Sequence, residues 1–190
     1  MAKQFESLNE KHQSFIAEQH LFFVGTAADG GTVNVSPKDM DSFRVIDSRT
    51  VAWLNLTGSG NETAAHLLDN DRMTIMFCSF DKHPLILRLY GRARVIYPSD
   101  AEWKEMISRF PDYTGARQVF VVALDRVQTS CGFAVPFYEL VGERTTLEKW
   151  SDQQGREGIA QYWQDRNLIS IDGKDTGMPD KVSSGEDSDR

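Results

Sequence analysis

The sequence predicts a mainly β protein, an antiparallel barrel of six strands with short helices at its periphery. Three observations support this fold class. The chain has 190 residues, which suits one domain, and 40% of them are hydrophobic, enough for a sizeable core. Turn residues or short amphipathic stretches separate its apolar, β-prone runs. The expected strands are residues 21–27, 32–38, 50–56, 72–80, 85–97 and 118–127.

The predicted helices occupy the N-terminus, two inserts between strands and a C-terminal segment. Phe15 and Ile16, with Phe5 and Leu8 before them, recur at helical spacing in the first segment. In each of the other three, a Ser or Thr precedes a Glu by three residues, the spacing of a capping box. The pairs are Ser59 and Glu62, Ser99 and Glu102, and Thr145 and Glu148.

Composition predicts two regions and excludes several classes of partner. Residues 1–171 read as one domain, and residues 172–190, rich in Gly, Ser and Asp, as a disordered acidic tail. The net charge of −7 argues against nucleic acid and anionic membranes as partners. The polar N-terminus is unlike a secretory signal, and no apolar run suffices for a membrane span. We therefore expect a cytoplasmic protein.

No residue pattern assigns a metal site or catalytic residues. Cys78 and Cys131 lie far apart, without the spacing of metal ligands, and are expected to be reduced thiols. His66 reads first as a structural hydrogen-bonding residue. The chain contains no convincing Ser/His/Asp set and no carboxylate pair, so a hydrolase has no support.

The turn after the third expected strand suits a phosphate. Gly58 and Gly60 permit a tight turn, and the N-terminus of the following helix offers free N–H groups to an anion. The alternative is an ordinary capping box made by Ser59 and Glu62, in which Glu62 would oppose an anion.

The strand at residues 85–97 has two different faces. Leu87, Leu89, Ala93 and Val95 share one face, which is expected to join Val33 and Val35 in the core. The other face carries Tyr90 and three arginines, Arg88, Arg92 and Arg94. Guanidinium groups match phosphate geometry, but salt bridges or a solvated face explain them equally well. Lys38 lies on the polar face of its own strand, and the same two interpretations apply to it: phosphate binding, or a salt bridge or solvated position.

Taken together, several segments resemble the pyridoxamine 5'-phosphate oxidase-like FMN-binding split-barrel proteins. They are NVSPKD at 34–39, AWLNL at 52–56, GSGNETAAHLLDNDRMTIMF at 58–77, RLYGRARV at 88–95 and TSCGFAVP at 129–136. The resemblance runs from about Gln19 to Gly173 and is closest to an uncharacterised branch of that family. It implies a split barrel and a homodimer that holds FMN in a groove at the subunit interface.

The resemblance also implies which residues contact FMN. Those expected to line the flavin and its ribityl chain are Asn34, Val35, Ser36 and Lys38. Those expected to border the ring are Trp53, Leu54 and Asn55, and those around the phosphate are Ser59, Asn61, Glu62 and Thr63. Arg88 and Tyr90 are expected as additional contacts.

Two departures from the family pattern shape the functional hypothesis. Thr63 and Ala64 stand where the oxidases carry an Arg-Lys pair for the phosphate, and the Arg-x-His element that holds pyridoxal phosphate has no counterpart. Vitamin B6 oxidation is thus disfavoured. The favoured function is an FMN-dependent oxidoreductase, such as a nicotinamide-dependent reductase. The alternative is a flavin-binding module that stores or senses flavin without turnover.

Overall fold

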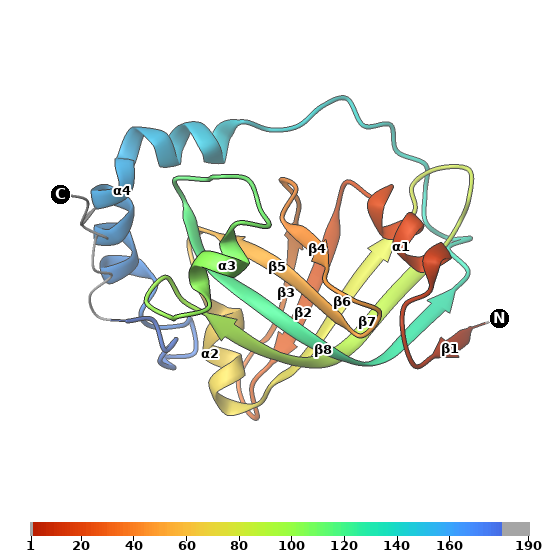
Figure 1. Ribbon diagram of the computed structural model, residues 1–190, viewed down its shortest axis with the longest axis horizontal. Helices are drawn as coiled ribbons and strands as arrows, with labels where there is room; N and C mark the ends of the chain where they lie inside the picture. Colours follow the sequence, from red (N-terminus) through yellow and green to blue (C-terminus); the bar gives the residue numbers. More distant parts are fainter. Residues whose placement is uncertain (1, 180–190) are drawn as a thin grey trace.

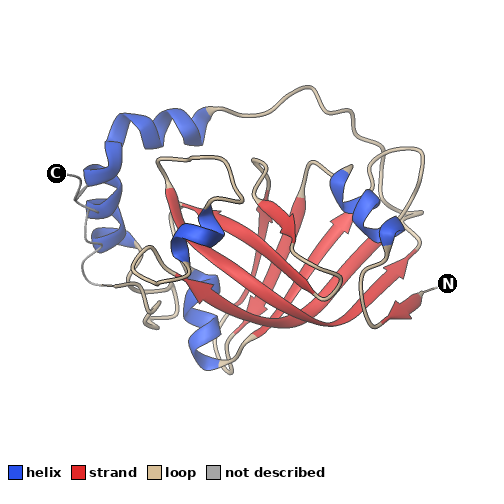
Figure 2. Ribbon diagram, in the orientation of Figure 1, coloured by secondary structure: helices blue, strands red, loops and turns tan. Residues whose placement is uncertain are grey.

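The computed structural model describes residues 2–179 and shows one curled antiparallel sheet with helices at its rim (Figures 1 and 2). The six predicted strands are all present and confirm the expected fold. They are β2 (Phe22–Ala27), β3 (Val33–Lys38), β5 (Thr50–Leu56), β6 (Arg72–Cys78), β7 (Ile86–Ile96) and β8 (Ala116–Ser130). Two strands that the sequence did not predict, β1 (Lys3–Phe5) and β4 (Phe43–Val45), extend the sheet.

The strands follow the order β3-β2-β6-β7-β8-β5-β4, with β1 paired to β8, and every pairing is antiparallel. β3 and β4 are therefore the two edges of the curled sheet and do not pair with each other. This leaves the barrel split on one side, between β3 and the β5–β4 end of the sheet.

Cross-strand register shows which side chains point into the barrel. One row runs from Ser36 through Val24 and Ile75 to Leu89, and the last three side chains are fully buried. Leu87 and Ala93 lie on this same inner face, as predicted.

The prediction that Val33 and Val35 belong to the core is wrong. Their side chains are 70% and 66% exposed, while Asn34, Ser36 and Lys38 point inward. Alternation identifies the residues that share a face of a strand, but it does not say which face is internal. Here the polar face is internal because it borders a polar pocket.

The helices are α1 (Glu10–Ala17), α2 (Glu62–Asp69), α3 (Trp103–Ile107) and α4 (Thr146–Arg166). None of the three predicted capping boxes forms: the N-caps of α2, α3 and α4 make no side-chain capping bond. A capping box does form at α1, between Asn9 and His12.

Two C-terminal segments complete the structure. Residues 131–145, which we call the arm, contain no helix or strand and cross from the end of β8 to α4 (Figure 1). After α4 the chain folds back onto the barrel and buries Thr176 and Met178. The tail predicted from Asp172 therefore starts too early, and residues 180–190 of it lie outside the described residues.

Candidate cofactor site

A polar pocket of about 590 Å³ opens at the split between β3 and β5. Its walls come from β3, the turn after β5, the start of α2, and the end of α4 with the loop that follows. The lining residues are Asn34, Ser36, Lys38, Asn55, Leu56, Gly58, Ser59, Gly60, Asn61, Glu62, Thr63, Arg117, Asp165, Arg166, Ile169, Ser170 and Ile171.

The structure brings together most of the residues that the resemblance assigned to FMN. Those at the pocket are Asn34, Ser36, Lys38, Asn55, Ser59, Asn61, Glu62 and Thr63. The side chains of Trp53 and Leu54 are instead buried in the core, where Trp53 stacks on Phe120 with ring centroids 4.5 Å apart. Val35 points outward from β3.

Arg88 and Tyr90 lie on the outer face of the sheet, away from the pocket. A row of cross-strand partners runs from Val35 through Gly25 and Thr74 to Tyr90, so these residues share the face opposite the core. The Arg88 guanidinium donates to Ser130 Oγ at 3.1 Å. The two residues do not line the pocket of their own chain.

The sequence reasoning missed Arg117, the most informative residue of the pocket. Its side chain is 2% exposed and donates from one terminal nitrogen to the Gly60 carbonyl (3.1 Å) and to Asn167 Oδ1 (2.6 Å). Its Nε has no partner, and none of the ion pairs among residues 2–179 includes it. Burial lowers the pKa of Arg117 to about 10, so it is charged at neutral pH.

A buried guanidinium without a counter-ion is costly unless a ligand compensates it. Its positive charge suits an anionic ligand such as a phosphate. In the sequence Arg117 begins an apolar strand, and nothing marks it as a neighbour of the Gly58–Asn61 turn. Only the pairing of β5 with β8 brings the two together.

Lys38 is the second cation of the pocket. Its Nζ donates to Asn55 Oδ1 at 3.3 Å and lies 5.3 Å from the centre of the Trp53 ring. Burial, and secondarily the charge of Arg117, lowers the pKa of Lys38 to about 8. The inward face of β3 therefore supplies a cation whose charge is sensitive to pH near neutrality.

The start of α2 is open to a ligand. Its N-cap, Asn61, pairs with the Gln118 amide (2.7 Å) and does not cap the helix. The Glu62 carboxylate, expected to oppose an anion, instead accepts the N–H of Ile171 at 3.1 and 3.2 Å. The predicted Ser59–Glu62 capping box is therefore absent, and the first-turn N–H groups have no side-chain acceptor.

The loop after α4 closes the outer side of this pocket. Besides the contact of Ile171 with Glu62, Asp172 accepts two hydrogen bonds from Thr32, at 2.7 Å from its N–H and 2.6 Å from its hydroxyl. Thr32 immediately precedes β3, so the loop is tied to both the hairpin and α2.

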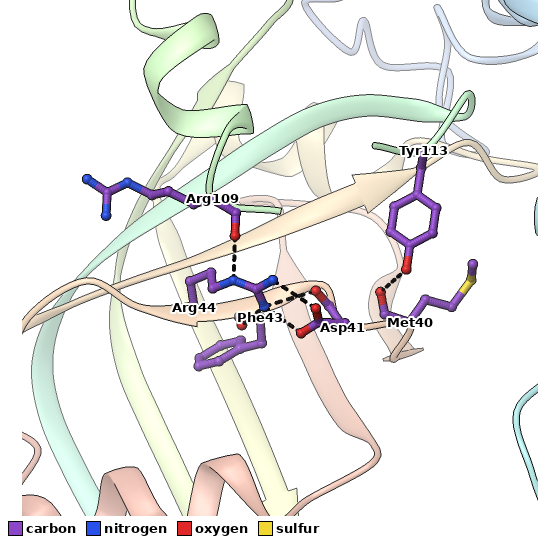
Figure 3. Close-up of polar contacts among 6 residues, drawn as sticks. All are labelled: Met40, Asp41, Phe43, Arg44, Arg109 and Tyr113. Carbon is purple, nitrogen blue, oxygen red and sulfur yellow. Dashed lines mark hydrogen bonds and ion pairs between the residues drawn. The ribbon is translucent and has the colours of Figure 1, made fainter. Parts of the chain in front are cut away.

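The turn between β3 and β4 follows Lys38 and is held by polar contacts to Met40 and Asp41 (Figure 3). Met40 and Asp41 adopt positive φ angles of 64° and 49°, a conformation that non-glycine residues rarely adopt. The Tyr113 hydroxyl donates to the Met40 carbonyl at 2.8 Å. Arg44 donates to both carboxylate oxygens of Asp41, at 2.6 and 2.9 Å. These contacts offset the backbone strain two residues after Lys38.

Replacing Arg44 with Ala should therefore lower the free energy of unfolding by about 2 kcal/mol, the scale of lost charge-assisted bonds. Arg44 also donates to the Arg109 carbonyl at 2.6 Å, which would lose its partner. Urea unfolding measures the loss. The matched control is Arg49→Ala, whose exposed ion pair with Glu6 should contribute less than about 0.5 kcal/mol. Equal effects of the two substitutions would contradict this role of Arg44.

The other arginines of β7 form surface ion pairs. Arg92 pairs with Asp71 and Arg94 with Glu102, each at 2.6 Å, which supports the salt-bridge interpretation of this strand face. His66 Nδ1 lies 3.0 Å from Thr26 Oγ1 in the interior.

The described residues show neither a metal cluster nor a membrane-spanning helix. Residues 2–179 contain no group of three or more His, Cys, Asp or Glu that could hold a metal ion. No helix in that range is long and apolar enough to cross a membrane.

The fold and the pocket define a split-barrel protein with a buried cationic site in its opening. Residues 8–131 match the family model of pyridoxamine 5'-phosphate oxidase, and the chain belongs to this family. A relative from Aspergillus flavus, the pyridoxamine 5'-phosphate oxidase family protein UstO, is 35% identical over 198 residues, covering 93% of this chain and 80% of the relative.

Solved structures share the fold. A putative pyridoxamine 5'-phosphate oxidase from Lactobacillus delbrueckii is 19% identical, covers 65% of this chain and 94% of its own, and superposes with a TM-score of 0.53. A single-residue variant of HupZ from Group A Streptococcus is 23% identical, covers 64% of this chain and 98% of its own, and has a TM-score of 0.51.

Proposed function

We propose that this protein binds FMN in the polar pocket and acts as an FMN-dependent oxidoreductase. The main support is the buried Arg117 guanidinium, which lacks a counter-ion among the described residues and lies at the pocket that also receives Lys38. The oxidases bind the phosphate with an Arg-Lys pair, which this chain replaces with Thr63 and Ala64. Arg117 would supply the phosphate with a cation in place of that pair.

The residues present fit the parts of FMN. Arg117, Ser59 and the N–H groups at the start of α2 would hold the phosphate. Asn34 and Ser36 offer polar side chains to the ribityl hydroxyls. Segment 165–171 closes the pocket beside the phosphate end, which favours FMN over a dinucleotide that must extend past its first phosphate.

Bound FMN would supply the hydride chemistry, and the protein would bind and orient it. The residues at the pocket would bind and position FMN, and no separate acid–base pair is needed among them. Lys38 holds a proton at Nζ on the inner face of β3, where its charge would favour electron density on a nearby ring. Because bound FMN would supply this chemistry, the missing Ser/His/Asp set does not count against an enzyme.

Anaerobic mixing of the FMN-loaded protein with NADH or NADPH tests this function. We expect bleaching of the flavin absorption band, followed by recovery when an electron acceptor is added. A flavin that dithionite reduces but neither nicotinamide reduces would overturn the nicotinamide-dependent activity and favour the storage or sensing alternative. A protein that takes up no FMN would overturn the proposal as a whole.

We further propose a homodimer in which each FMN contacts both chains. Arg88 and Tyr90, expected to contact FMN, lie on the outer face of the sheet and cannot reach the pocket on its other side. They could reach the pocket of a second copy. A hollow of about 620 Å³ on this face, bordered by Gly25, Val33 and Tyr90, supports packing of a partner there.

The pH dependence of FMN binding should report on Lys38. Because burial lowers its pKa to about 8, the charged form is complete well below that pH and is lost above it. FMN affinity should thus be nearly constant up to about pH 7 and fall about tenfold by pH 9 as binding requires proton uptake. Fluorescence titration of FMN at each pH measures this. The Lys38→Arg variant, which stays charged, should remove the decline, and a decline that persists in it would contradict the assignment.

A further inference from the structure

A second, apolar cavity of about 1250 Å³ lies beneath the arm. Its walls are the side chains of Phe23, Phe80, Tyr138, Leu140, Leu147 and Trp150. The arm contacts the barrel over this cavity, because the Tyr138 N–H donates to the Phe80 carbonyl at 3.1 Å and the two rings lie 5.2 Å apart. The cavity is large enough for a multi-ring molecule, and such a lining favours apolar ligands.

The cavity and the polar pocket meet at Lys38, which lies in the lining of both. A molecule in the cavity would therefore approach whatever occupies the polar pocket from the Lys38 side. No other residue is shared between the two linings.

Two carboxyl groups face each other at the cavity, one from the end of β3 and one from the arm. The carboxyl groups of Asp39 and Glu143 both line the cavity and lie close to each other, and neither takes part in an ion pair among residues 2–179. Burial, reinforced by Glu143, raises the pKa of Asp39 to about 6, so Asp39 is still charged at pH 7.5.

The other charged groups of the lining do not reverse the negative charge that Asp39 and Glu143 give to the cavity. The remaining acidic residues are Glu18, Asp81 and Glu139, the basic ones are His20, Lys38 and Arg144, and Cys78 and Tyr138 add a thiol and a phenol. Lys38 is partly neutral at pH 7.5 for the reason given above. The lining is therefore negative overall and disfavours a phosphorylated or carboxylated ligand.

We propose that this cavity is the substrate site and that it takes an apolar, ring-bearing molecule with a protonated amine. The rings would fill the apolar lining, and the ammonium group would bridge Asp39 and Glu143, which supply the missing opposite charge. As a substrate assignment this rests on the proposed function, whereas binding to the cavity does not.

Three probes of similar shape test the ligand class on the FMN-loaded protein at pH 7.5. They are 2-naphthylmethylamine, 2-naphthylmethanol and 2-naphthoate, and calorimetry measures their binding. The amine should bind about tenfold more tightly than the alcohol, the scale of one charge-assisted contact, and the carboxylate should not bind measurably. Bound amine should also shift the visible absorption of the flavin, because the two sites meet at Lys38.

Matched variants separate the two features of the cavity. The double substitution Asp39→Asn and Glu143→Gln should remove the preference for the amine and leave the affinity of the alcohol unchanged. Leu140→Asn, in the apolar wall, should weaken both probes. The control is Val141→Asn, one residue further along the arm, whose side chain is 99% exposed and absent from the lining. It should bind both probes like the unchanged protein.

Equal affinities for the three probes, or no binding of any, would overturn the proposal. Failure of the probes together with a loss of self-association in Leu140→Asn would show that a second copy fills the cavity instead. Repeating the titrations without FMN separates the two proposals. Amine binding by a protein that takes up no FMN would support the amine site in the cavity and reject the proposed function. FMN uptake without amine binding would support FMN binding and reject the amine site.

Discussion

Replacing Arg117 with Met should weaken FMN binding about a hundredfold, because the phosphate would lose its buried cation. Met has a similar length and no charge, so the change removes both the electrostatic attraction and the N–H donors. Titration of the FMN-free protein with FMN and with riboflavin measures the effect. The affinity for riboflavin, which lacks the phosphate, should change much less than that for FMN.

Arg117→Lys is the matched control for this prediction. It retains a positive charge and should recover part of the FMN affinity, although not the geometry of a planar guanidinium. The FMN-free Arg117→Met protein should remain folded, because removing an uncompensated buried charge offsets the loss of its bonds to Gly60 and Asn167. Equal losses for FMN and riboflavin would show that Arg117 does not bind the phosphate.

Val35→Glu should convert the proposed dimer to a monomer and reduce FMN uptake with it. Val35 is highly exposed in the single chain, so the substitution should cost the monomer little, whereas a carboxylate buried against a second sheet would be strongly unfavourable. Analytical ultracentrifugation at several concentrations measures self-association, and absorbance measures the flavin content.

The control for this interface is Leu68→Glu, an exposed apolar residue on α2 and not on the sheet. It should leave the association state unchanged. A Val35→Glu protein that remains a flavin-loaded dimer would place the interface elsewhere. A monomer that still binds FMN with full affinity would instead contradict the proposal that both chains contact the cofactor.

Much of the fold was predictable because strand signals are local. Alternating or continuous apolar runs bounded by turn residues marked all six long strands. The strands β1 and β4 have three residues each, too few to show a period. The inward direction of β3 was not predictable, because an edge strand whose polar face lines a pocket has the same alternation as one whose polar face meets solvent.

The candidate site was predictable only where its residues are close in sequence. The resemblance located β3 and the Gly58–Asn61 turn, which together form much of the pocket. Arg117 comes from the start of β8 and Ile171 from the loop after α4, so tertiary contacts alone bring them to the turn. The Ser59–Glu62 capping box failed for a related reason: Glu62 has a distant partner, Ile171, that the local pattern cannot show.

The loop after α4 has a consequence for how fast the cofactor could leave. It closes the pocket through hydrogen bonds that are largely exposed, from Thr32 to Asp172 and from Ile171 to Glu62. Segments held by exposed bonds open locally at a small fraction of the cost of global unfolding. The residence time of a bound cofactor would then depend on this loop, while its equilibrium affinity depends mainly on Arg117 and Lys38. The two properties could change independently during evolution, because different segments of the chain set them.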